Sequence, residues 1–385
     1  MIYVLSIDWL AVHCYYYAPG NDEETHRAAN VWKPNEDESA KGELFGNYPF
    51  RYKLAPYGTR QFSKLYYVAM PNEEGGWDDF AEVQCAPFSG ILKPNSVIIR
   101  FVNRVLYRRD FWELAGAFLA GNSFTFVGIS RIDICADFND FATISPKTLI
   151  EGFAAKKYRH VGRGQGKLFF THGIGAEKDE HDRPIKDYGV RYTGLSFGTH
   201  TSDAHVYLYD KSEELKTQGD KPWIRDTWTA AGLDVRHVWR LEVSIKSKGC
   251  KFKDKATNTK IEIDMERVTQ GGELNKIYLT FADKMFSFVV NRKGITNITR
   301  EPRIVLFEKG AEVYQRAILR NVSAGNRVQR MIIKALYQLG DLYRGSSNIE
   351  SADLAQSFAV NIAESTDLAR WMSTKITEWD KPTHL

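Results

Sequence analysis

The segment His205–Glu214 reads HVYLYDKSEE, and its alternating pattern decides how the rest of the chain is interpreted. Successive side chains of a β-strand point to opposite faces of the sheet. Tyr207, Tyr209 and Lys211 therefore share one face, and mostly apolar side chains share the other. A phenol ionises near pH 10, so it needs a nearby cation or base to act as a nucleophile. The pattern suits attack on a phosphodiester, and a half-solvated surface strand is the alternative.

Two other segments, residues 130–138 (SRIDICADF) and 239–246 (WRLEVSIK), have the same construction. Each has one apolar face and one face of charged or polar side chains. The polar sets are Arg131, Asp133, Cys135 and Asp137 in the first segment and Arg240, Glu242, Ser244 and Lys246 in the second. If these strands share a sheet with the tyrosine strand, its polar face gathers carboxylates that could bind a divalent cation.

The spacing of the acids limits which of them share one ion. Asp133 and Asp137 lie four residues apart, roughly 13 Å along an extended strand. Ligand oxygens must lie within about 2.0–2.6 Å of the ion. We therefore favour Asp133 and Glu242 as the metal ligands. Arg131 and Arg240 would neutralise a phosphate or pair with the aspartates, since ion-pair networks resemble active sites.

The order of these motifs resembles a known family. An R-x-D-x-x-x-D strand is followed by Gly-Thr-x-x-Ser, by a strand ending Tyr-Asp-Lys-x-x-Glu, and by W-R-x-E. Over roughly residues 1–310, this order resembles the trans-acting replication initiators of rolling-circle plasmids and phages. Relaxases of some integrative conjugative elements are similar to that family. The resemblance implies nicking and rejoining of origin DNA through a phosphotyrosine intermediate, with Tyr209 preferred over Tyr207 as the nucleophile.

The resemblance also implies a cofactor, supporting residues and partners. The cofactor is Mg²⁺ or Mn²⁺, and Lys211 would lower the pKa of the phenol or neutralise the phosphate. Further ligands, or residues that hold the ligands in place, would be Asp137, Arg131, Arg240 and Glu214. The family has an acid in its opening strand, but we interpret Asp8 as a residue that caps or turns the strand end. The expected partners are single-stranded or hairpin origin DNA, a host helicase and a second copy of the chain, in the bacterial cytoplasm.

Three alternative functions stay open. A relaxase would nick a transfer origin by the same chemistry. A DNA-binding regulator could keep the fold without catalysis, although Tyr209, Lys211, Asp133 and Glu242 together argue against that. An RNA-binding ferredoxin-like protein would carry exposed aromatic side chains on the sheet face in place of carboxylates.

The bulk composition allows these functions without demanding them. The chain has 385 residues, a formal net charge of +4 and 43% hydrophobic residues, which is enough for one or two folded domains. The cysteines show no C-x-x-C pair, so we expect neither a zinc site nor disulfides, and a reducing compartment. The first residues do not resemble a signal peptide, and no apolar run is long enough to span a bilayer.

The expected fold is α+β, with antiparallel sheets of ferredoxin-like βαβ character, a polar catalytic sheet face and an α-helical C-terminal appendage. The nicking domain would cover residues 1–315, and the helical region residues 316–385. Helices are expected at 108–119, 145–158, 222–236 and 273–290, and a short strand at 303–309.

The segment KKYRHVGRGQGK, residues 156–167, is basic and glycine-rich, as is typical of a loop that follows DNA phosphates, or of a merely solvated loop. The predicted DNA contacts are Lys156, Lys157, Arg159, Arg163 and Lys167, and the lysines between Lys246 and Lys255 suit phosphate contact or plain solvation.

Overall fold

A computed structural model describes residues 1–17, 31–34, 50–88, 92–162, 166–172, 190–199, 201–292, 297–308 and 312–318. The chain divides into two compact units, Met1–Ile318 and Leu319–Leu385. The described residues all belong to the first unit. The predicted helical region therefore lies almost wholly outside the described residues and stays a prediction, as do the limits of the nicking domain.

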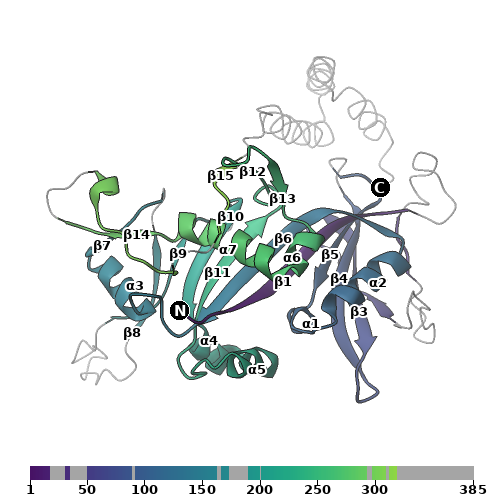
Figure 1. Ribbon diagram of the computed structural model, residues 1–385. Helices are drawn as coiled ribbons and strands as arrows, with labels where there is room; N and C mark the ends of the chain where they lie inside the picture. Colours follow the sequence, from purple (N-terminus) through teal and green to yellow (C-terminus); the bar gives the residue numbers. More distant parts are fainter. Residues whose placement is uncertain are drawn as a thin grey trace, which may run out of the picture. The chain divides into compact units, whose positions relative to one another are not determined.

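An antiparallel ten-stranded sheet is the frame of the first unit (Figure 1). Its strand order is β2-β3-β4-β5-β1-β6-β11-β10-β9-β8. The strands are β1 (Val4–Tyr16), β2 (Arg51–Leu54), β3 (Phe62–Pro71), β4 (Trp77–Pro87), β5 (Ser96–Phe101), β6 (Phe124–Phe138), β8 (Lys167–His172), β9 (Val190–Phe197), β10 (Ala204–Asp210) and β11 (Trp239–Lys246). The predicted α+β class with antiparallel sheets is confirmed.

Helices and two small sheets accompany this frame. The helices are α1 (Asn103–Leu106), α2 (Phe111–Gly121), α3 (Pro146–Ala154), α4 (Lys211–Gln218), α5 (Pro222–Ala230), α6 (Met265–Thr269) and α7 (Gly271–Met285), with a 3₁₀ turn η1 (Ile298–Arg300). The small sheets join β12 (Lys251–Asp254) to β13 (Lys260–Glu262) and β15 (Arg316–Ile318), and β7 (Tyr158–His160) to β14 (Phe288–Val290). Among the described residues, no helix is both long enough and apolar enough to cross a bilayer.

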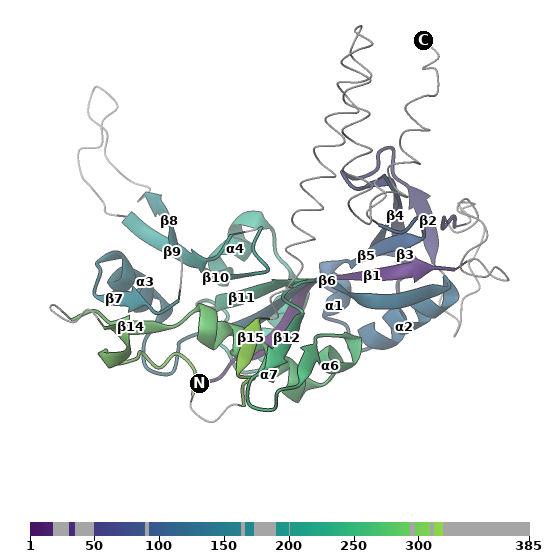
Figure 2. The same ribbon diagram turned by 90° about the horizontal axis from the view of Figure 1, so that it is seen from above.

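The two faces of the central strands differ as the alternation predicts. Leu208, Leu241 and Ala136 lie opposite one another across β10, β11 and β6, and all are fully buried. α7 packs against this apolar face, where the Tyr278 hydroxyl donates a hydrogen bond to the Leu241 carbonyl at 3.1 Å. Figure 2 shows α7 on one side of these strands and α4 on the other. The second face is left to the polar side chains.

The predicted βαβ character has a partial counterpart. β5 and β6 are each antiparallel to β1, which lies between them, so they run parallel to each other. α1 and α2 connect them, which makes a split β-α-β crossover. α2 begins and ends close to the predicted limits because Phe111, Leu114, Ala115 and Phe118 form its buried face. A complete ferredoxin-like unit stays a prediction.

Several predicted element boundaries are wrong. Lys211 does not continue its strand but begins α4, because the Asp210 side chain caps that helix by accepting from the Glu213 amide at 2.9 Å. The helix expected at 273–290 ends at Met285, and its last residues form β14. The helix expected at 222–236 ends at Ala230. The strand expected at 303–309 is reduced to one bridge between Arg303 and Val289.

Candidate active site

The polar sheet face is assembled by the register of three adjacent strands. On β10 and β11, Tyr207 lies opposite Glu242, and Tyr209 lies opposite Arg240. On β6, Cys135 lies opposite Glu242, and Asp137 lies opposite Arg240. Residues directly opposite each other in a ladder lie on the same face. The segments that the sequence separates by up to a hundred residues therefore share one surface.

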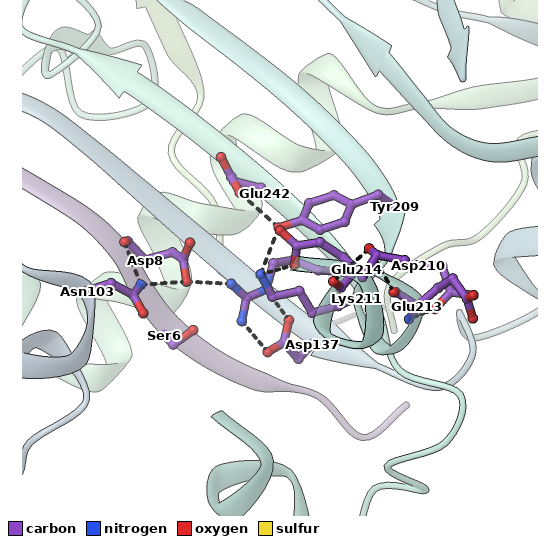
Figure 3. Close-up of polar contacts among 12 residues, drawn as sticks. Ser6, Asp8, Asn103, Asp137, Tyr209, Asp210, Lys211, Glu213, Glu214 and Glu242 are labelled. Atoms are coloured by element: carbon purple, nitrogen blue, oxygen red, sulfur yellow. Dashed lines mark hydrogen bonds and ion pairs between the residues drawn. The ribbon is translucent and has the colours of Figure 1, made fainter. Parts of the chain in front are cut away.

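The Tyr209 hydroxyl points toward Glu242 and Lys211 on this surface (Figure 3). The hydroxyl donates to Glu242 Oε2 at 3.4 Å, and Lys211 Nζ donates to that hydroxyl at 3.5 Å. The Tyr209 ring stacks on that of Tyr207, with centroids 4.6 Å apart. Burial raises the pKa of Tyr209 well above its usual range, and the nearby Arg240 charge opposes this shift. The phenol is thus protonated at rest and is held between an acceptor and a cation.

Lys211 reaches Tyr209 from the first turn of α4. The Lys211 side chain is buried, with 1% of its surface exposed, and it pairs with Glu214 one helical turn later. Because Asp210 fixes the start of the helix, Lys211 and Glu214 are fixed relative to β10. The predicted proximity of Lys211 to Tyr209 holds, although a helix rather than a strand provides it.

Arg240 is fully buried and lies in a network of acids. Its Nε and Nη2 donate to the two Asp137 oxygens at 2.6 and 2.7 Å, and its Nη1 donates to Asp8 Oδ1 at 2.5 Å. The Trp228 indole N–H from α5 also donates to Asp137, at 2.7 Å. Arg131 pairs with Asp133 in a similar two-bond arrangement, at 2.9 and 2.5 Å. Both arginines therefore make the ion pairs that the sequence left as their alternative role.

Asp8 joins the site through a register irregularity in β1. The pairing with β6 shifts between Ile7 and Trp9, so Asp8 is the extra residue of a bulge. The expectation that Asp8 ends or turns the strand is wrong, since β1 continues to Tyr16. The Asn103 amide and the Tyr107 hydroxyl, both from the α1 region, donate to Asp8 Oδ1 at 3.0 Å.

Two carboxylates and one thiol of this surface form a group suited to a cation. Ligand atoms of Asp8, Cys135 and Glu242 all lie within 4.8 Å of one another. Burial, together with the charges of Asp133 and Asp8, raises the pKa of Glu242 to about 7. Burial would also raise the pKa of Asp8, but Arg240 and Lys211 hold it well below its usual range. A divalent cation would relieve the repulsion between these acids, and hard cations such as Mg²⁺ prefer carboxylate oxygens.

This grouping suggests Asp8 and Glu242 as the carboxylate ligands of a cation, whereas the sequence favoured Asp133 and Glu242. Both Asp133 oxygens accept from Arg131, whereas Asp8 Oδ2 accepts no hydrogen bond from the described residues. Burial raises the pKa of the Cys135 thiol well above its usual range, so it stays protonated and is a poor ligand for a hard cation. Glu242 is common to both sets, and the role of Asp133 as a ligand stays a prediction.

The polar face continues beyond the site in both directions along the sheet. On β8, Phe169 packs against Tyr207, with ring centroids 4.8 Å apart, and the Lys167 ammonium lies 5.0 Å from the Phe169 centroid. On β1, the Trp9 ring lies 4.6 Å from both the Arg100 and the Arg131 guanidinium carbons. His13 and Tyr15 follow Trp9 on the same face, with their rings in edge-to-face contact.

The predicted DNA contacts divide into separate groups. Lys167 is exposed and lies on the face of Tyr207, since both pair with Ser196 of β9. Lys156 and Lys157 are exposed at the end of α3, and Arg159 is half-buried in β7, which pairs with β14 in a separate small sheet. Arg163 lies outside the described residues. Their contact with DNA stays a prediction.

The sequence alone did not reveal the contributions of Asp8, Asn103, Tyr107 and Trp9. The available signals for Asp8 were its charge within the apolar run VLSIDWLAV and the acid that the family has in its opening strand. Nothing in the spacing of Asn103 and Tyr107 indicates a site. The face of the aromatic residues of β1 depends on the bulge at Asp8, which places Trp9 on the same face as Ser6, and no local pattern reveals that bulge.

Comparisons with known proteins give limited help. No family model and no curated protein matches the chain. Among solved structures, the rolling circle replication initiator protein from Geobacillus stearothermophilus is similar, with a TM-score of 0.42 and 13% sequence identity. The match covers 80% of this chain and 99% of that chain. A likeness of this degree is no basis for assigning function, which must be argued from the site.

Proposed function

We propose that this protein nicks and rejoins DNA through a covalent bond to Tyr209, as a replication initiator or a relaxase would. The observation that carries the proposal is the position of the Tyr209 hydroxyl, 3.4 Å from Glu242 Oε2 and 3.5 Å from Lys211 Nζ. A phenol needs a proton acceptor and a cation to attack phosphorus at neutral pH. Both lie within reach of the same oxygen.

The proposed reaction is a transesterification. Tyr209 Oη gives its proton to Glu242 Oε2 and attacks the phosphorus of a phosphodiester. The bond from phosphorus to the 3′ oxygen breaks, and that oxygen takes up a proton and leaves as a 3′-hydroxyl, while the 5′ phosphate stays on Tyr209. Attack by the 3′-hydroxyl on the phosphotyrosine reverses the step and rejoins the strand without an external energy source.

The surrounding residues have separate tasks. The Lys211 ammonium and the buried Arg240 guanidinium stabilise the phenolate that develops on Tyr209. Asp8 and Glu242, with Asp133 as the predicted further ligand, would hold a Mg²⁺ or Mn²⁺ ion. When bound, that ion would neutralise charge on the phosphate. Asp137 and Trp228 would hold Arg240 in place without touching DNA.

The open face beside the site supports single-stranded DNA as the substrate. Aromatic side chains interleaved with cations bind unpaired bases and phosphates without sequence preference. Trp9, Tyr15 and Arg131 on one side of the site and Lys167 on the other supply both kinds of contact on the same face.

The test is covalent capture of DNA. Labelled single-stranded oligonucleotides that tile the DNA flanking the gene are incubated with the protein and Mn²⁺ and then separated under denaturing conditions. We expect a covalent adduct with the wild-type chain and with Tyr207→Phe, and none with Tyr209→Phe, which should still bind the oligonucleotide. An undiminished adduct in Tyr209→Phe would rule out this nucleophile. Binding of Mn²⁺, measured as a rise in melting temperature, should be lost in Glu242→Gln and kept in Tyr209→Phe.

A further inference from the structure

A large cleft lies on the sheet face opposite Tyr209. Its volume is about 1060 Å³, and its walls come from the β9–β10 turn, the end of α7 and the segment that leads into β15. Ala204 lines the cleft and belongs to the apolar face of β10, whereas Tyr207 and Tyr209 point the other way. The sheet itself therefore separates this cleft from the proposed nicking site.

The cleft has more cations than acids. Lys248, Lys284, Arg303 and Arg316 line it, against Asp203 and Asp283. His160 also lines it, but burial lowers the pKa of its imidazole, which is therefore neutral at pH 7. Within the described part of the chain, no ion pair at 4.0 Å or less engages any of these lysines and arginines.

Arg316 and Lys284 show most clearly that a negative charge is lacking. Lys284 Nζ donates to the Arg316 carbonyl at 3.4 Å, and the Arg316 guanidinium carbon lies 4.0 Å from the Phe281 ring centroid. Arg316 Nε is buried and has no hydrogen-bond partner among the described residues. Burial lowers the pKa of both side chains. The Arg316 charge lowers the pKa of Lys284 further, and the Asp203 charge offsets only part of the shift of Arg316. Two like charges in a partly desolvated place are stabilised by an anion between them.

We propose that this cleft binds the phosphate groups of a phosphorylated ligand. Its cations supply charge, and the hydroxyl groups of Thr201 and Ser202 in the β9–β10 turn supply neutral hydrogen-bonding groups at the same wall. The volume is at the upper end of the roughly 300–1,000 Å³ typical of small-molecule pockets. It admits a nucleotide or a short stretch of nucleic-acid backbone, and the phosphate chemistry is common to both. The proposal uses none of the residues of the nicking site.

The test compares two sources of phosphate on the full-length chain. Pyrophosphate and ATP are titrated by calorimetry, and a fluorescent duplex of arbitrary sequence is titrated by anisotropy at several salt concentrations. The variant is Lys284→Gln with Arg316→Gln, and the matched control is Lys53→Gln, an exposed lysine of β2 at the other end of the sheet. Circular dichroism checks the fold, and Arg316→Lys should restore part of the binding.

We expect the double variant to lose at least tenfold in affinity for one class of ligand, while Lys53→Gln matches the wild-type chain. Loss of pyrophosphate and ATP binding identifies a free phosphorylated ligand. Loss confined to the duplex identifies a DNA backbone, and the slope of log K against log salt should then fall by about 1.8, or about 0.9 for each lost phosphate contact. Absence of binding by the wild-type chain, or equal binding by wild type and double variant, would overturn the proposal.

Discussion

The buried ion pair between Asp137 and Arg240 gives the sharpest prediction about the site. Asp137 is 1% exposed and accepts from Arg240 at 2.6 and 2.7 Å and from Trp228 at 2.7 Å. The Asp137→Asn substitution keeps the size of the side chain and removes its charge. The Arg240 guanidinium would then be buried with only Asp8 and the Tyr107 hydroxyl to compensate it.

The magnitude follows from these contacts. Breaking a buried pair from one side costs about 3–5 kcal/mol because a charge stays in a place without water. Asn keeps one oxygen, which still accepts from either Arg240 or Trp228, and Asp8 still offsets part of the Arg240 charge. We therefore expect a loss at the lower limit, about 3 kcal/mol. This is a large part of the about 5–15 kcal/mol that stabilises a typical protein.

The assay is urea unfolding followed by tryptophan fluorescence, to which Trp228 should contribute. The control is Asp234→Asn, which removes a fully exposed partner of Arg236 and should leave the midpoint unchanged. At temperatures below unfolding, Asp137→Asn should still bind Mn²⁺, since Asp137 is not among the grouped ligands. If Asp137→Asn is as stable as Asp234→Asn, or if it loses Mn²⁺ binding while folded, Asp137 does not have the structural role inferred here.

Two further predictions test the acids and the aromatic face. The pKa of Glu242 is about 7 in the folded chain against an ordinary 4.5, so the folded state holds this proton more tightly than the unfolded state does. The contribution of this proton to the stability of the fold is therefore complete below pH 4.5 and is lost as pH rises through 7. Without divalent cations, Glu242→Gln should therefore be more stable than wild type at pH 8, by up to about 3 kcal/mol at about 1.4 kcal/mol per pH unit. Near pH 4.5 the two chains should be equally stable in urea unfolding. A difference in stability that stays constant with pH would contradict the raised pKa. Trp9→Ala should weaken binding of a single-stranded oligonucleotide by about 1–3 kcal/mol in anisotropy titrations. The control Tyr57→Ala changes a side chain that is 83% exposed between β2 and β3, and it should not weaken binding. Equal effects of the two substitutions would exclude a DNA path along β1.

Periodicity in the sequence was enough to predict the two faces of β6, β10 and β11. Alternation of side chains is a property of any extended backbone, so the polar sets around Asp133, Tyr209 and Glu242 could be assigned before their partners were known. The same holds for α2, whose buried residues repeat at helical spacing, and for α3, which begins at Pro146 as expected. These features depend on interactions between residues close in the chain.

The tertiary structure decided which of these residues meet. Asp8 enters the site only because a bulge shifts the pairing of β1 with β6, and Lys211 reaches Tyr209 from a helix that Asp210 starts. Strand order and register result from the packing of the whole core, so no local pattern reveals that Arg240 is enclosed by Asp137, Asp8 and the indole of Trp228. The alternating pattern assigned each side chain to a face, whereas its neighbours, its burial and its proton affinity depend on contacts between distant residues, such as Asp8 and Arg240, 232 positions apart.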